Sequence, residues 1–101
     1  MVKKDVMIRF LGPDDGGRPH FPLLRGYRPH FRVGQGDLMG VVLAESDREF
    51  GDGQYQRVTV DLVYEGLVDY SALDPEVHFN VLEGLRVVGD GYVIGSARQE
   101  T

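Results

Sequence analysis

The sequence predicts an all-β domain, built as a closed barrel or as a sandwich. Three observations lead to this fold class: alternating apolar and polar segments recur along the chain, turn-forming residues separate them, and no segment has the pattern of a ten-residue helix. Six such segments fit within about 90 residues, a spacing typical of small barrels and sandwiches. A barrel is favoured because it hides strand edges, and the chain has no obvious residues that would protect exposed edges.

Each expected strand has a local reason. In the first strand, Val6, Ile8 and Phe10 form one face, while Met7 and Arg9 form the other. The intervening segments are rich in glycine, proline and aspartate, which favour turns. The second strand begins at a proline, which is tolerated at a strand start. The predicted strands are residues 6–10, 29–33, 38–43, 57–63, 77–81 and 86–94.

The C-terminal half contains the clearest alternation, at residues 57–63. The last strand is expected to bend at Gly89 and Gly91, because a glycine inside a strand indicates a bulge or a close approach of another backbone. A long connection at residues 65–76 precedes the fifth strand. The tail at residues 96–101 is small and polar, and we expect it to be frayed.

Length and composition predict one domain spanning residues 1–101. The 42% hydrophobic and 27% charged content is that of an ordinary soluble protein, and no apolar run approaches the ~20 residues of a membrane span. The N-terminal segment lacks the apolar core of a secretory signal. The absence of cysteine excludes disulfides, thiolate nucleophiles and zinc-thiolate sites. We therefore expect a cytoplasmic protein with no membrane association.

The charge is unevenly distributed along the chain. Residues 1–36 hold seven basic and three acidic side chains, a net +4, whereas residues 37–101 hold four basic and thirteen acidic ones, a net −9. The total of −5 would repel a phosphate backbone if it were spread evenly, but a polarised chain can still present one basic face. The alternative is that the opposite charges intermix once the chain folds.

Two glycine pairs, Gly34 with Gly36 and Gly89 with Gly91, invite comparison with phosphate-binding loops. Neither continues as G-x-G-x-x-G, neither opens a helix after a strand, and the lysine motif of the P-loop is absent. The glycines are therefore interpreted as bend residues. We predict no nucleotide and no other cofactor.

Metal binding and catalysis have weak support. His20 and His30, with Asp14 or Asp15, offer zinc-ligating groups, but their spacing fixes no geometry and surface histidines are the favoured interpretation. No serine lies in a G-x-S-x-G context, and no carboxylate pair can be assigned to a cleft. We expect neither a metal site nor an enzyme.

Residues 18–32 interleave arginine and histidine with phenylalanine and tyrosine. Arginine forks bind phosphate and aromatic rings stack on bases, so RNA binding is one interpretation of this segment. The other is that Tyr27 and Phe31 belong to the core and that the arginines pair with acidic residues of the C-terminal half.

Four motifs follow one another in the order found in a known family. They are Gly16-Gly17-Arg18 with His20 and Pro22, Gly26-Tyr27-Arg28-Pro29-x-Phe31, Asp37-x-x-Gly40, and Glu83-Gly84-x-Arg86-x-Val88-Gly89-x-Gly91. On these motifs the chain resembles the C-terminal β-barrel, domain III, of elongation factor Tu. The resemblance runs from about residue 5 to 95 and is weak between residues 45 and 77.

The resemblance implies a six-stranded antiparallel closed β-barrel and a binding role. In that family the barrel packs on two other domains, touches the T-stem of aminoacyl-tRNA and is engaged by the nucleotide-exchange factor. It also implies that these 101 residues are no GTPase, because they do not include the nucleotide-binding domain.

The chain departs from the family where RNA contacts are expected. Leu82 stands where the family has arginine, Leu85 where it has glycine, His30 where it has glutamine, and Gly34 where it has arginine. A leucine cannot contact phosphate by charge, and Leu85 adds bulk where glycine allows close approach. The resemblance thus implies a retained scaffold with part of the RNA surface lost.

We therefore predict a freestanding barrel that acts as a non-catalytic binding module. The net charge and the lost arginines favour a protein partner over RNA. That protein is either a different protein or a second copy of this chain. Leu82 and Leu85 are expected to make an apolar contact, while RNA binding through residues 18–32 is the alternative. The candidate partner-binding residues are Arg18, His20, Arg25, Arg28, His30, Leu82, Glu83, Leu85 and Arg86.

Overall fold

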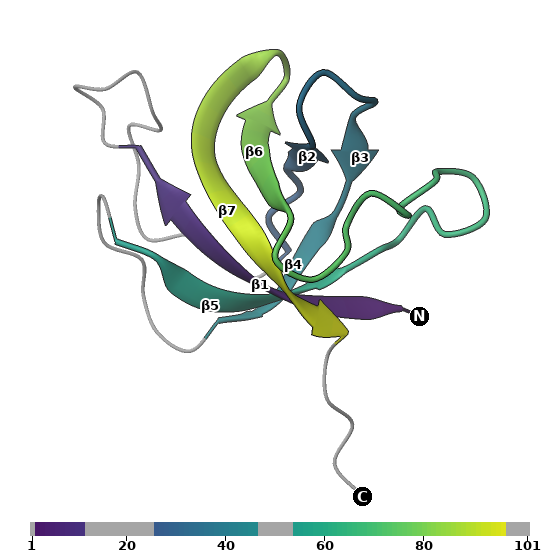
Figure 1. The fold of residues 1–101 in the computed structure, drawn as a ribbon, viewed down its shortest axis with the longest axis horizontal. Coiled ribbons are helices and arrows are strands. Elements are labelled where there is room, and N and C mark those ends of the chain that lie inside the picture. The colour runs from purple at the N-terminus through teal and green to yellow at the C-terminus, as the bar shows by residue number, and fades with distance from the viewer. Residues whose placement is uncertain (1, 12–25, 47–53, 97–101) are drawn as a thin grey trace, which may run out of the picture.

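The computed structural model describes residues 2–11, 26–46 and 54–96. Over these ranges the chain has no helix and forms one antiparallel sheet of seven strands that curls into a nearly closed barrel (Figure 1). The prediction of an all-β barrel is confirmed. The strands are β1 Lys3–Phe10, β2 His30–Arg32, β3 Met39–Gly40, β4 Val42–Ser46, β5 Gln56–Asp61, β6 His78–Glu83 and β7 Arg86–Ser96.

Six strands were expected and seven are found, because the strand expected at residues 38–43 is interrupted at Val41 and forms β3 and the start of β4. The order in the sheet is β3-β2-β6-β7-β1-β5-β4, so β3 and β4 lie at opposite ends of the order although only Val41 separates them in the chain. The Val41 N–H donates to the Pro29 carbonyl at 3.1 Å, and the Leu43 N–H donates to the Tyr27 carbonyl at 2.8 Å. Since Leu43 also pairs with Val60 on β5, this stretch is bonded on both sides and joins the ends of the sheet.

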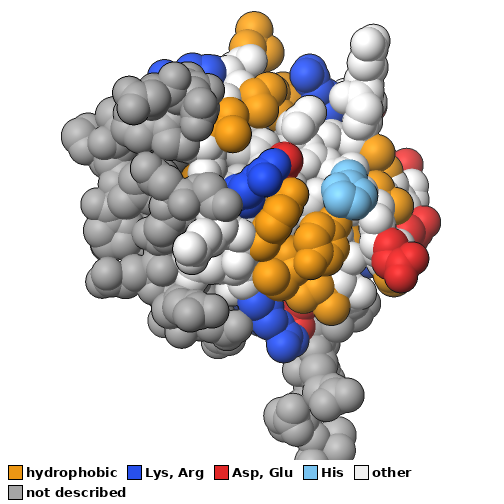
Figure 2. All heavy atoms as spheres, turned by 60° about the vertical axis from the view of Figure 1, so that its left-hand side comes forward, with side chains coloured by type: hydrophobic (Ala, Val, Ile, Leu, Met, Phe, Trp, Pro, Cys, Tyr) orange, Lys and Arg blue, Asp and Glu red, His pale blue; other side chains and the backbone are white. Residues whose placement is uncertain are grey.

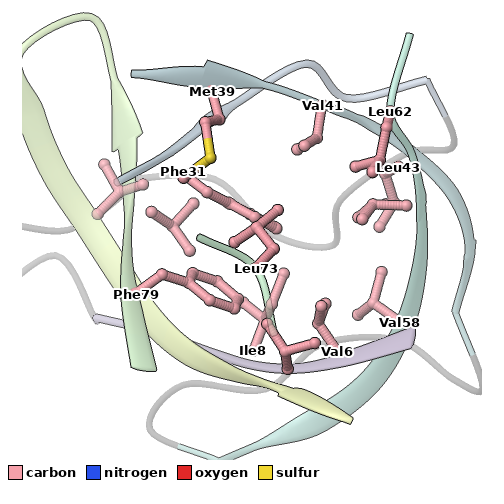
Figure 3. Close-up of a cluster of buried hydrophobic side chains, with 14 of the residues drawn as sticks. Val6, Ile8, Phe31, Met39, Val41, Leu43, Val58, Leu62, Leu73 and Phe79 are labelled. Carbon is pink, nitrogen blue, oxygen red and sulfur yellow. The ribbon is translucent and has the colours of Figure 1, made fainter. Parts of the chain in front are cut away.

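The barrel interior is filled by the side chains that the alternation places inward. Phe31 and Phe79 stack with ring centroids 4.1 Å apart, and Figure 3 shows side chains from opposite walls pointing toward one another around them. Full burial of each such side chain is worth roughly 1.5–3 kcal/mol. The core cluster comprises Val6, Ile8, Phe10, Phe31, Met39, Val41, Leu43, Val58, Val60, Leu62, Leu73, Phe79, Val81, Val88 and Val93.

The connection between β5 and β6 closes part of the barrel, with Leu73 completely buried in the core. The Tyr70 hydroxyl donates to the Gly40 carbonyl at 2.6 Å and accepts from the Tyr64 N–H at 3.2 Å. The Lys4 ammonium donates to the Leu73 carbonyl at 3.0 Å. This connection is therefore an ordered part of the barrel, and its burial raises the pKa of Tyr70.

At Gly89 and Gly91 the long strand β7 lies very close to the backbone of β1, which is one of the two alternatives that the sequence predicts for these glycines. A Cβ atom at Gly91 would overlap the Met7 carbonyl oxygen and the ring of Phe79, and one at Gly89 would overlap the Arg9 carbonyl oxygen. Glycine is required at both positions because the backbone of β1 approaches so closely. The expected frayed tail beyond Ser96 and the turns within residues 12–25 and 47–53 lie outside the described residues.

Candidate functional site

The described members of the predicted binding set gather around the β6–β7 hairpin. His30 on β2 is the register partner of Leu82 on β6, and Glu83 pairs with Arg86 across the two-residue turn Gly84-Leu85. Gly84 has a φ of 61°, as the first central residue of a type II′ turn requires. This turn joins β6 to β7, and its neighbours in space come from the start of β2.

A hydrogen bond between Tyr27 and Glu83 connects the hairpin to the segment that leads into β2. The Tyr27 hydroxyl donates to a Glu83 carboxylate oxygen at 2.5 Å, and the Tyr27 ring packs edge-on against Phe10 with centroids 6.0 Å apart. Arg28 next to it is exposed and His30 is half-buried. The hairpin is thus held in place by a charge-assisted hydrogen bond.

The two leucines that replace family residues have opposite environments. Leu85 is 86% exposed at the turn, whereas Leu82 is completely buried. Val81 belongs to the core cluster, whereas Leu82, the next residue of β6, is completely buried outside that cluster. The expectation of an apolar contact made by both leucines is therefore corrected: Leu82 is completely buried, and of the two only Leu85 is exposed.

Three predicted contact residues, Arg18, His20 and Arg25, lie outside the described residues, so their placement stays a prediction. The same holds for the zinc-ligand alternative that uses His20. Within the described ranges, no three histidine, aspartate or glutamate side chains are grouped so that they could hold a metal ion.

A second surface lies on the outer face of β5, β1, β7 and β6. The strand register places Arg57, Met7, Tyr92 and His78 side by side in one row across these four strands. The Tyr92 ring lies 5.6 Å from the Tyr55 ring on one side and 5.6 Å from the His78 ring on the other, centroid to centroid. We call Met7, Tyr55, His78, Tyr92 and Ile94 the aromatic patch.

The aromatic patch is bordered by basic side chains, and Figure 2 shows apolar side chains with Lys or Arg on two sides and a histidine beside them. The Arg9 guanidinium lies 4.8 Å from the Tyr55 ring centroid. It also donates to both carboxylate oxygens of Asp90, at 3.2 and 2.9 Å, and this pairing raises the pKa of Arg9. Burial, together with the negative charge of Asp90, raises the pKa of Tyr55.

Arg57 is anchored by a buried carboxylate. Its guanidinium donates to one oxygen of Asp5 at 2.6 Å, and the Thr59 hydroxyl donates to the other at 2.6 Å. Burial alone would raise the pKa of Asp5, but these two hydrogen bonds and the Arg57 charge outweigh it and hold the pKa below its usual value. Asp5 therefore stays ionised beneath Arg57.

The aromatic patch does not belong to the sequence-predicted site. The signal in the sequence is local: Met7 lies on the polar face of its strand, and Tyr92 alternates with inward-facing Gly91 and Val93. What the sequence does not contain is the register that brings three rings from different strands together. A pattern of outward-facing aromatic residues on neighbouring strands would be the signal to search for.

No family model matches the chain. Within the described ranges, the structure contains no helix that is both long and apolar enough to cross a membrane.

Proposed function

We propose that this chain is a non-catalytic binding module, similar to domain III of elongation factor Tu, that recognises a protein partner through the β6–β7 hairpin. The observation that carries the proposal is the exposure of Leu85, 86% of whose surface is open to solvent on a turn of fixed geometry. A large apolar side chain contributes little to folding at such a position, whereas it becomes an anchor once a partner buries it.

The surroundings of Leu85 resemble the rim of a protein interface. Glu83 and Arg86 flank the turn, and exposed Arg28 and half-buried His30 lie in the neighbouring segment. An apolar anchor within a ring of polar side chains is the usual anatomy of a protein contact. The hydrogen bond from Tyr27 to Glu83 supports a turn that is ordered before binding, which lowers the entropy cost of association.

A protein partner is favoured over RNA for this surface. Leu85 offers no charge to a phosphate, and the acidic Glu83 lies directly beside it. The two basic residues nearby, Arg28 and Arg86, suit a mixed-charge protein rim as well as they suit phosphate. The chain's net charge of −5 adds a general repulsion toward a nucleic acid at this hairpin.

The experiment compares three baits in affinity capture from a native lysate treated with ribonuclease: the wild-type chain, Leu85→Ser and Leu85→Met. Loss of an anchor at an interface costs 2 kcal/mol or more, about 30-fold in affinity. We expect a bound protein that is depleted with Leu85→Ser and retained with Leu85→Met, because methionine keeps the apolar volume.

A protein profile that is the same for all three baits would contradict the proposal. If the partner is a second copy, the same variants will show it by sedimentation: the wild type and Leu85→Met associate with rising concentration, and Leu85→Ser does not. Signal that disappears with ribonuclease would instead favour RNA binding. Thermal unfolding of each bait confirms that the exposed substitution leaves the fold intact.

A further inference from the structure

The aromatic patch is a surface that neither the fold nor the proposed hairpin contact explains. Tyr55 and His78 are exposed, and Tyr92 lies half-buried between them, although all three side chains sit on the outer face of the barrel wall. The three rings are neighbours, and Ile94, two residues after Tyr92, is also exposed. Figure 2 shows a group of apolar side chains gathered on one side of the molecule. Such clusters on small soluble proteins mark contact sites.

We propose that this face binds single-stranded nucleic acid, with bases stacking on the rings of the aromatic patch. Every base has a planar π-face, so a row of exposed rings on adjacent strands binds successive bases with little dependence on their identity. The two ring-to-ring distances of 5.6 Å are those of rings in direct contact, which places Tyr55, Tyr92 and His78 along one short path.

Charge at this face supports a polyanion as the ligand. Three basic side chains around the patch pair with carboxylates. In two of the pairs the basic member is the more exposed one, whereas Arg9 and Asp90 are about equally exposed, at 37% and 34%. Arg57 is 50% exposed against 6% for Asp5, and Lys3 is 47% exposed against 18% for Asp61. A phosphate approaching Arg57 or Lys3 therefore meets more of the basic side chain than of its acidic partner, while beside Arg9 it also meets Asp90.

Part of the net charge of −5 comes from the connection between β5 and β6, whose last acidic residue, Glu76, donates its N–H to the Val93 carbonyl at 2.8 Å and so lies near the patch. The connection at residues 62–77 carries Glu65, Asp69, Asp74 and Glu76 and no lysine or arginine. These four acidic side chains are exposed on the segment that closes the barrel. Fields from separated charges are screened within about 10 Å at ordinary ionic strength, so this segment weakens the attraction only partly.

Single strands fit this face better than duplexes do. Stacking on a protein ring requires a base that has left its own stack, and bases in a helix are covered by their neighbours. A peptide fits less well, because the patch presents rings and guanidinium groups more than the aliphatic lining that would bury apolar peptide side chains. The choice between DNA and RNA is decided by the experiment, since both supply the same bases and phosphates.

The test measures fluorescence anisotropy of labelled oligonucleotides of roughly twelve nucleotides, a length within the usual range of site sizes. The probes are oligo-dT, oligo-rU and the oligo-dT·oligo-dA duplex, each titrated with the full chain at about 50 mM salt. We expect saturable binding of one or both single strands with a Kd below about 100 µM, weaker binding of the duplex, and an affinity that falls as salt is added.

The variants separate stacking from a merely structural role. Tyr92→Leu keeps an apolar side chain but removes the ring, and we expect it to weaken binding about five- to hundredfold, whereas Tyr92→Phe stays within about twofold of the wild type. His78→Ala, at an exposed position, is expected to weaken binding without disturbing the fold. Leu85→Ser is the control, since it alters the proposed protein contact and leaves the aromatic patch untouched.

Three results would overturn the inference: no binding of either single strand, a duplex affinity equal to that of the single strands, or equal affinities of Tyr92→Leu and Tyr92→Phe. A fourth is a protein whose capture depends on Tyr92 while nucleic-acid affinity does not, which would assign the patch to a protein partner. None of these results bears on Leu85, so the two proposals fail separately.

Discussion

Asp5 shows how a single residue determines the electrostatics of the outer face. It is a buried charged side chain on β1, and it accepts hydrogen bonds from both Arg57 and Thr59. Its side chain is only 6% exposed, whereas that of Arg57, which donates to it, is 50% exposed. The sequence shows Asp5 only as one acid between Lys4 and Val6, and nothing local indicates that its partners are more than fifty residues away.

The depressed pKa of Asp5 predicts an acid-dependent loss of stability. A carboxyl whose pKa is lower in the folded than in the unfolded chain stabilises the fold above the unfolded value, near 4, and this contribution is lost as pH falls through the folded value. At neutral pH we expect Asp5→Asn to lower the free energy of unfolding by about 1–2 kcal/mol. The difference from the wild type should shrink as pH falls from about 5 toward 3.

Urea unfolding at pH 7, 5, 4 and 3 measures this difference. Asp37→Asn, at an exposed position, is the control and should follow the wild-type curve at every pH. If Asp5→Asn runs parallel to the wild type over the whole range, the ion pair and hydrogen bonds of Asp5 do not supply the pH dependence.

The longest of the described strands is β7, with 11 residues, and it pairs with both β1 and β6. Its bulges at the Val81/Leu82 and Asp5/Val6 shifts bend it around the core, and its glycines admit the backbone of β1. The same strand carries the hairpin turn at its start and Tyr92 near its end. One strand therefore positions both proposed contact surfaces.

A glycine pair within β7 tests this role. Gly91→Ala would place a Cβ against the Met7 carbonyl and the Phe79 ring, and we expect it to lower the free energy of unfolding by about 1–3 kcal/mol or more. Gly95→Ala, in the same strand with no atom within 4 Å of the added Cβ, should change it by no more than about 0.5 kcal/mol. Chemical denaturation measures both, and equal effects would show that the close approach of β1 is not the constraint.

The strands could be predicted from the sequence because strand alternation and turn residues are local signals. The close approach of β1 at Gly89 and Gly91 is one of the two alternatives that the same reasoning predicts. Leu73 could not be assigned to the core, because it lies in a segment without periodicity and is buried only by the closure of the barrel. Likewise, strand alternation places Leu82 on the face of β6 opposite to Val81, so its burial could not be predicted from the local pattern.

Only part of the candidate surface could be predicted from the sequence. Glu83, Leu85 and Arg86 do share one hairpin with His30 nearby, as the order of the motifs implies. The aromatic patch could not be predicted, since its rings belong to three segments that only the register brings together. Local patterns identify elements, whereas surfaces that cross several strands depend on pairings between distant parts of the chain.

At the scale of the whole molecule, the two proposed surfaces differ in chemistry and in position. The hairpin presents one leucine among mixed charges, and the aromatic patch presents rings with outward-facing cations. Acidic side chains dominate the connection at residues 62–77 instead. The opposite charges of the two halves of the sequence intermix in part on folding, since Lys3 pairs with Asp61 and Arg9 with Asp90.

This separation predicts that the two surfaces act independently. Leu85 and Tyr92 are seven residues apart, a contour of roughly 23 Å along an extended strand, and they face different surroundings. Substitutions that far apart and without shared partners add to within about 0.5 kcal/mol. We therefore expect Leu85→Ser to leave single-strand affinity within about twofold of the wild type and Tyr92→Leu to leave protein capture unchanged.

The double variant Leu85→Ser/Tyr92→Leu completes a cycle in both assays. Its loss in each assay should equal that of the relevant single variant, and its free energy of unfolding should equal the sum of the two separate changes. A loss of binding in either assay that exceeds the loss caused by the relevant single variant would mean that the hairpin and the aromatic patch contact one ligand together. In that case one extended binding surface along β7 would replace the two separate ones.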